Sequence, residues 1–115
     1  MDAGACAAKV VAVVSDRSKA QALEYARERG IAATAVPLRK GDDRDLWNVK
    51  LAETVVAAKP DVVVLAGFMR VLGAPLLEAF PGRIINVHPA LLPSFPGHTG
   101  PQDAIDGGVR LSGCT

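Results

Sequence analysis

Four short apolar runs rich in Val, Ile and Ala recur along this chain of 115 residues, and helix-length segments separate most of them. The runs span residues 9–14, 31–36, 61–65 and 83–87. Apolar runs without polar alternation are typical of parallel strands buried on both faces, and their alternation with helices is typical of α/β proteins. We therefore expect an α/β fold with a doubly wound, mostly parallel, Rossmann-like sheet, and a single domain over residues 1–115.

The first helix is expected over residues 20–30. Its apolar positions Ala22, Leu23 and Ala26 share one face, and Gly30 is a favourable residue for ending a helix. Capping oxygens are available just before this segment at Ser15, Asp16 and Ser18. The following strand ends at Pro37, and residues 38–45 then form a charged turn.

A second helix is expected over residues 45–59, and Pro60 ends it. Its buried stripe is formed by Leu51, Val55 and Ala58, whereas Trp47 fits the buried side no better than the exposed side and is interpreted as a packing residue. Shorter helical segments are expected over residues 74–80 and 101–106, and residues 111–115 resemble the beginning of a strand.

Composition excludes several classes of protein. The formal net charge is +1, with 13 Lys and Arg against 12 Asp and Glu, whereas a nucleic-acid binder is normally clearly basic. No apolar run approaches the roughly 20 residues that a membrane span needs, and no basic segment precedes an apolar one at the start, as a signal peptide would require. We expect a cytoplasmic protein in which the two cysteines, Cys6 and Cys114, are reduced thiols and no metal is bound.

Asn86 and His88 are the residues with the clearest chemical potential. They are two positions apart at the carboxyl end of an expected parallel strand, so they share a face at the edge where α/β sheets bind ligands. An amide that donates to an oxyanion, beside an imidazole that moves a proton, suits acyl transfer. On this tripeptide alone, a strand-end pair satisfied by loop carbonyls is the preferred interpretation, because Asn-x-His is a weak signal.

The surrounding segments resemble the phosphoribosylglycinamide formyltransferase family. The resemblance is carried by INVHPALLPSFPG at 85–97 and VVVLAGFMRVL at 62–72, and it extends from VVAVVSDR at 10–17 to SGCT at 112–115. The family transfers a formyl group from 10-formyltetrahydrofolate to the amine of glycinamide ribonucleotide. The resemblance therefore implies purine biosynthesis, with formyl folate as cosubstrate and without a metal.

The same resemblance implies roles for individual residues. His88 corresponds to the general acid and base, and Asn86 to the residue that holds the formyl oxygen. The segment Met69, Arg70, Val71 and Leu72 corresponds to the lining of the folate pocket, and Arg44 to an arginine on the folate side. Relatives have a histidine one place later than His98, so His98 is not included among the expected catalytic residues.

Two family features are missing from these 115 residues. The phosphate-binding Gly-x-Gly-x-Asn loop would precede them, and the aspartate that orients the histidine would follow Thr115. We therefore expect a partial domain, incomplete at both termini, with low stability or self-association because sheet edges are left open. The alternatives are a formyltetrahydrofolate deformylase, a methionyl-tRNA formyltransferase, or a truncated product without catalysis.

Overall fold

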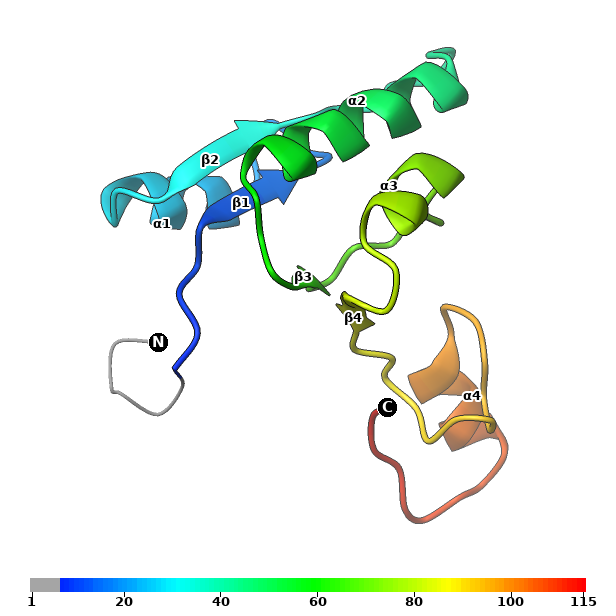
Figure 1. The fold of residues 1–115 in the computed structure, drawn as a ribbon. Coiled ribbons are helices and arrows are strands. Elements are labelled where there is room, and N and C mark those ends of the chain that lie inside the picture. The colour runs from blue at the N-terminus through cyan, green and yellow to red at the C-terminus, as the bar shows by residue number, and fades with distance from the viewer. Residues whose placement is uncertain (1–6) are drawn as a thin grey trace. The chain divides into compact units, whose positions relative to one another are not determined.

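The computed structural model describes residues 7–115, in which strands and helices alternate as the sequence predicts (Figure 1). Contacts divide the chain into two compact units. The first runs to Asp61 and includes Leu72–Pro81, and the second consists of Val62–Val71 and Gly82–Thr115. The strand pairs are parallel, which confirms a partial Rossmann-like α/β fold. The single domain over residues 1–115 stays a prediction.

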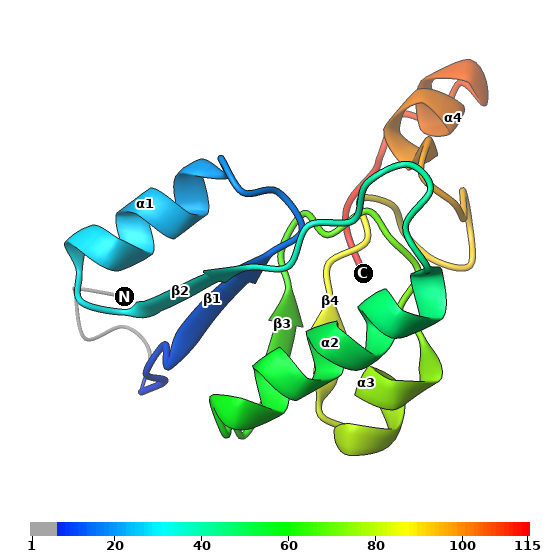
Figure 2. The same cartoon turned by 90° about the horizontal axis from the view of Figure 1, so that it is seen from above.

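The first unit is built on a parallel pair of strands. Strand β1, Ala12–Ser15, pairs with β2, Ala32–Ala35, in a register that aligns Ala12 with Ala32. β1 begins three residues later than expected and includes Ser15, because the Ser15 carbonyl accepts a hydrogen bond of 2.8 Å from the Val36 amide and so extends the ladder. Figure 2 shows the two strands side by side, with helix α1 next to them.

Helix α1, Gln21–Glu28, differs from the expectation in its cap and in one buried position. Its N-cap residue is Ala20, which makes no side-chain cap, and Ser15 Oγ instead accepts from the Arg17 amide, so the expected capping role of Ser15, Asp16 and Ser18 is wrong. Leu23 and Ala26 are buried, whereas Ala22 is exposed. The described sheet beneath α1 is two strands wide, and it covers only a narrow stripe of the helix.

Helix α2, Arg44–Ala57, and helix α3, Ala74–Ala79, pack against each other in the first unit. Leu51 and Val55 are buried as predicted, and Ala58 is half-buried at the C-cap. Trp47 is also buried, although the sequence did not show whether it lies on the buried or the exposed face of the helix. Its indole Nε1 donates to the Val36 carbonyl at 2.8 Å and so ties α2 to the end of β2.

The second unit contains the parallel strands β3, Val63–Leu65, and β4, Ile84–Asn86, followed by helix α4, Gly100–Asp106 (Figure 2). Residues 111–115 do not form the expected strand. Only Thr115 pairs, because its amide and carbonyl exchange hydrogen bonds of 2.9 and 2.7 Å with those of His88. This mutual exchange is the geometry of an antiparallel pair.

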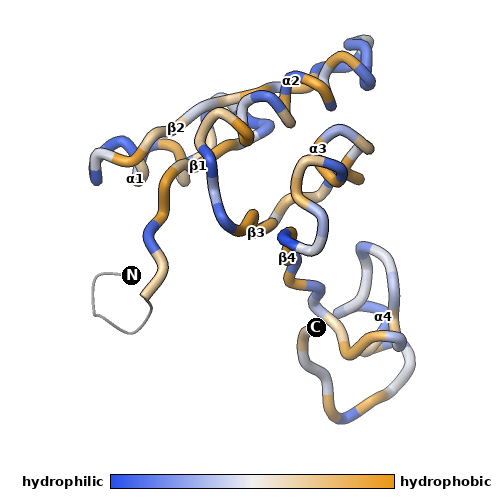
Figure 3. Tube along the Cα trace, viewed as in Figure 1, coloured by the Kyte–Doolittle hydropathy of each residue, from blue (hydrophilic) through white to orange (hydrophobic). Residues whose placement is uncertain are grey.

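Hydropathy follows the elements of each unit. In Figure 3 the tube is hydrophobic along β1 and β3, and hydrophilic and hydrophobic segments alternate along α2. Among residues 7–115 no helix is both long and apolar enough to cross a membrane. Cys114 is an exposed free thiol, and Cys6 lies outside the described residues.

Candidate active site

The second unit contains a cavity of about 320 Å³ at the carboxyl ends of β3 and β4. The two strands are parallel and their last residues, Leu65 and Asn86, are paired, so the loops that follow β3 and β4 leave the sheet at the same edge. The cavity is lined by the loop after β3, by the end of β4 and by the loop between β4 and α4. The lining residues are Gly67, Phe68, Met69, Arg70, Val71, Asn86, Val87, His88, Pro89, Gly97 and His98. This is the edge at which α/β sheets place their ligands.

Asn86 and His88 both line this cavity, as their spacing predicted. Asn86 is the last residue of β4 and its side chain is exposed, so its amide is available to a ligand. His88 is half-buried, and its Nε2 lies 3.1 Å from the Phe95 carbonyl oxygen. Its backbone is held by the pair of hydrogen bonds to Thr115, which fixes the start of the loop.

The wall formed by the loop after β3 combines apolar side chains with one guanidinium. Met69 and Val71 are 81% and 84% exposed, so their apolar surface faces solvent rather than a core. Arg70 is half-buried between them. Exposed apolar side chains next to polar groups are typical of a ligand-binding surface.

The charges around the cavity are cationic or neutral. Its lining includes the guanidinium of Arg70 and the imidazoles of His88 and His98, and no Asp or Glu is among the described lining residues. Such a lining favours ligands that carry carboxylate or phosphate groups. An amide donor and an imidazole on the same cavity can stabilise an oxyanion and move a proton, respectively.

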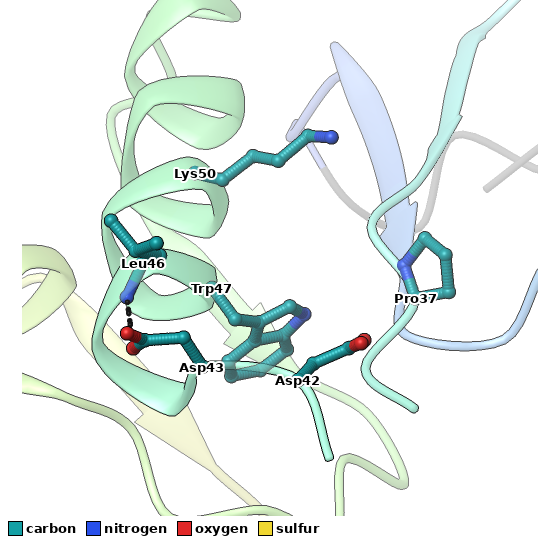
Figure 4. A pocket seen from close by; sticks show the side chains of 6 residues that line it. All are labelled: Pro37, Asp42, Asp43, Leu46, Trp47 and Lys50. Atoms are coloured by element: carbon teal, nitrogen blue, oxygen red, sulfur yellow. Dashed lines mark hydrogen bonds between the residues drawn. The ribbon is translucent and has the colours of Figure 1, made fainter. Parts of the chain in front are cut away.

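Arg44 and Leu72, which the resemblance also assigned to the folate, belong to the first unit. The Arg44 guanidinium lies 4.8 Å from the centre of the Trp47 ring, a cation–π contact. Next to it is a second cavity of about 260 Å³, lined by Pro37, Asp42, Asp43, Leu46, Trp47 and Lys50 (Figure 4). Within the described residues, no group of three or more His, Cys, Asp or Glu gathers as a metal site would.

Sequence reasoning missed two features of the main cavity. His98 lies on its wall, although it was not included among the expected catalytic residues, and the irregular loop that carries it has no periodic pattern that could have placed it there. The Phe95 carbonyl that meets the His88 ring had no signal, because a backbone acceptor in an irregular loop leaves no mark in side-chain patterning.

Comparison with known proteins gives relatives among curated sequences and among solved structures. The chain is 46% identical over 108 residues to phosphoribosylglycinamide formyltransferase of Mycobacterium tuberculosis. The aligned region covers 94% of this chain and 50% of that protein. Among solved structures, glycinamide ribonucleotide transformylase 1 from Symbiobacterium toebii matches with a TM-score of 0.87 and 43% identity, over 93% of this chain and 50% of that one. The chain therefore spans about half the length of the curated relatives it matches.

A formyltetrahydrofolate deformylase from Pseudomonas syringae also matches in structure, with a TM-score of 0.82 and a lower identity of 28%, over 93% of this chain and 35% of that one. The model of the family described as formyl transferase matches residues 1–115. Because that match covers the whole sequence, the chain belongs to the formyl transferase family.

Proposed function

We propose that the protein is a cytoplasmic phosphoribosylglycinamide formyltransferase, which transfers a formyl group from 10-formyltetrahydrofolate to the amine of glycinamide ribonucleotide in purine biosynthesis. One observation carries this proposal most directly. Asn86 and His88, the amide and the imidazole that formyl transfer requires, line the same cavity as the loop that the resemblance assigned to the folate. The similarity to formyltransferases of the same name supports the choice of substrates.

The wall of the cavity suits a flat heteroaromatic ligand that carries negative charge. Met69 and Val71 offer exposed apolar surface on which such a ring can pack, and Arg70 offers a guanidinium for a carboxylate or phosphate. The volume of about 320 Å³ falls within the range of small-ligand sites, roughly 300–1,000 Å³. The roles of Arg44 and Leu72 toward the folate stay predictions from the resemblance.

In the proposed reaction, the amine nitrogen forms a bond to the formyl carbon while the bond from that carbon to N10 of the folate breaks. One proton leaves the amine and one is delivered to N10. Asn86 donates a hydrogen bond from its amide to the formyl oxygen, which becomes negatively charged as the amine adds. His88 takes the proton from the amine and returns it to the leaving nitrogen.

Formyl transfer by the purified chain tests the proposal, with formylated glycinamide ribonucleotide measured by mass spectrometry. We expect His88→Ala to lower kcat by about 10²–10⁴-fold, the usual contribution of a general acid–base group. Ile105→Ala is the control, because Ile105 is exposed on α4 and is not among the residues lining the cavity. A chain that is folded by circular dichroism and shows no transfer would overturn the proposal.

The same assay distinguishes the deformylase alternative. A transferase releases its formyl group to the amine, so formate should not accumulate when the amine substrate is omitted. Formate release that is independent of glycinamide ribonucleotide and is lost in His88→Ala would assign the cavity to a hydrolase instead.

A further inference from the structure

We propose that Phe95, braced by helix α4, is a positioning residue that fixes His88 in one tautomer and one ring orientation. The inference rests on the proposed function, in which His88 moves the proton. It goes beyond that function because it identifies the contact that fixes the tautomer and orientation of the imidazole before any substrate binds.

The tautomer follows from the chemistry of the contact. His88 Nε2 lies 3.1 Å from the Phe95 carbonyl oxygen, and a carbonyl oxygen only accepts hydrogen bonds. Nε2 therefore carries the hydrogen, and in the neutral ring Nδ1 is left with the lone pair. Within residues 7–115 Nδ1 has no hydrogen-bond partner, so it is the nitrogen available to take a proton.

The backbone at Phe95 is in a conformation that an ordinary residue avoids. Its φ is 54°, in the left-handed region, where a side chain crowds the following carbonyl. Non-glycine residues adopt such a conformation infrequently, and strained positions of this kind gather at functional sites. Here the carbonyl of the strained residue is the one that meets the imidazole.

Helix α4 supplies the surroundings that hold Phe95. At its first residue, a Cβ added to Gly100 would lie 3.2 Å from the Phe95 carbonyl oxygen and 3.2 Å from the Ala90 Cβ. Just beyond its other end, a Cβ added to Gly107 would lie 3.3 Å from Cε1 of the Phe95 ring. The backbone of the helix thus reaches both the carbonyl and the ring, and glycine at both places permits this close approach.

This arrangement has a chemical consequence for proton transfer. When Nδ1 takes a proton the ring becomes cationic, and the existing bond from Nε2–H to the Phe95 carbonyl becomes charge-assisted and stronger. The carbonyl thus sets which nitrogen acts as the base.

The test reads the tautomer directly from the ¹⁵N chemical shifts of the neutral imidazole. The chain has two histidines, so a His98→Gln background leaves His88 as the single imidazole. In that background we expect the Nε2–H form to dominate. Phe95→Tyr, which keeps ring and backbone, should retain it.

Two variants should weaken the hydrogen bond between the His88 imidazole and the Phe95 carbonyl, each by a different structural change. Gly100→Ala displaces the carbonyl, and Phe95→Gly removes the ring contact with Gly107 while it tolerates the left-handed backbone. Each should raise the ratio of Nδ1–H to Nε2–H about fivefold, the factor that corresponds to the net free energy of one neutral hydrogen bond. Ile105→Ala, exposed on the same helix, should leave the ratio unchanged.

The inference is overturned if the parent chain populates both tautomers equally, or if both releasing variants stay folded by circular dichroism and keep the parental ratio. Because no substrate is present, the result is independent of formyl transfer. An inactive chain with the expected tautomer response would refute the proposed function and leave the positioning role standing.

Discussion

Trp47 shows at the scale of one residue how the first unit is joined. Its ring is buried, its Nε1 bonds the Val36 carbonyl, and Arg44 lies against its face. The sequence could not place Trp47 because apolar side chains lie all around α2, and Leu46, for example, is 69% exposed. Without a clear apolar stripe, periodicity does not identify the buried face.

We expect Trp47→Phe to destabilise the first unit. The change removes the indole N–H and leaves the Val36 carbonyl without its buried donor, which costs about 1–3 kcal/mol. Urea unfolding followed by far-UV circular dichroism measures the loss. Tyr25→Phe is the control, because it removes an exposed aromatic hydroxyl and should change the free energy of unfolding by no more than about 0.5 kcal/mol. Equal losses in the two variants would contradict the role of the buried bond.

Gly73 and Asn48 form a second close contact within the first unit, and its packing depends on the identity of both residues. A Cβ at position 73 would lie 2.9 Å from the Asn48 Cβ, closer than real side chains approach. Asn48 is itself buried, and its Oδ1 has no hydrogen-bond partner among the described residues. The pair joins α2 to the start of α3, and glycine at position 73 is what permits their close approach.

Gly73→Ala should therefore cost about 1–3 kcal/mol through overpacking. In an Asn48→Ala background the cost should fall by about 1 kcal/mol, because most of the opposing side chain is gone. The single tryptophan, Trp47, reports unfolding of this unit by fluorescence in a double-mutant cycle. Additive effects of the two substitutions would show that the contact does not govern the packing.

At the scale of elements, the sequence predicted the type and order of every strand and helix found in residues 7–115, but the strand expected at 111–115 does not form. Strand boundaries moved by one to three residues, because ladder hydrogen bonds decide them rather than the apolar run itself. The joint placement of Asn86 and His88 was predictable, since strand alternation is geometric. His98 and the Phe95 carbonyl were not, because the path of the loop at 89–99 has no periodicity to follow.

The N-terminus of α2 is capped by the side chain of Asp43. Asp43 Oδ1 accepts from the amides of Asp45 and Leu46 at 2.8 and 3.0 Å, as Figure 4 shows for Leu46. Asp43→Ala should lower the free energy of unfolding by about 1 kcal/mol, because two helix amides lose their acceptor. Asp43→Asn, which keeps a capping oxygen, should recover most of this loss. Trp47 fluorescence in urea is the readout, and equal stability of the two variants would exclude the cap.

At the scale of the whole molecule, the chain spans about half the length of its curated relatives, and both described sheets contain two strands. Each strand in these sheets therefore has one unpaired edge within the described residues. In the second unit, Val64 and Ile85 are register partners on one face and are 60% and 55% exposed. Open strand edges beside exposed apolar side chains favour association between sheets.

We expect the chain to self-associate through this face, with a second copy as the partner. Sedimentation velocity over a range of concentrations should show a concentration-dependent increase in mass. Val64→Thr keeps the shape and the β-branch but adds a hydroxyl, so it should weaken association about tenfold, or about 1.4 kcal/mol. Val49→Thr makes the same change at an exposed position of α2 and should have no effect. A chain that stays monomeric at every concentration, or equal weakening by both substitutions, would show that the sheet face does not drive association.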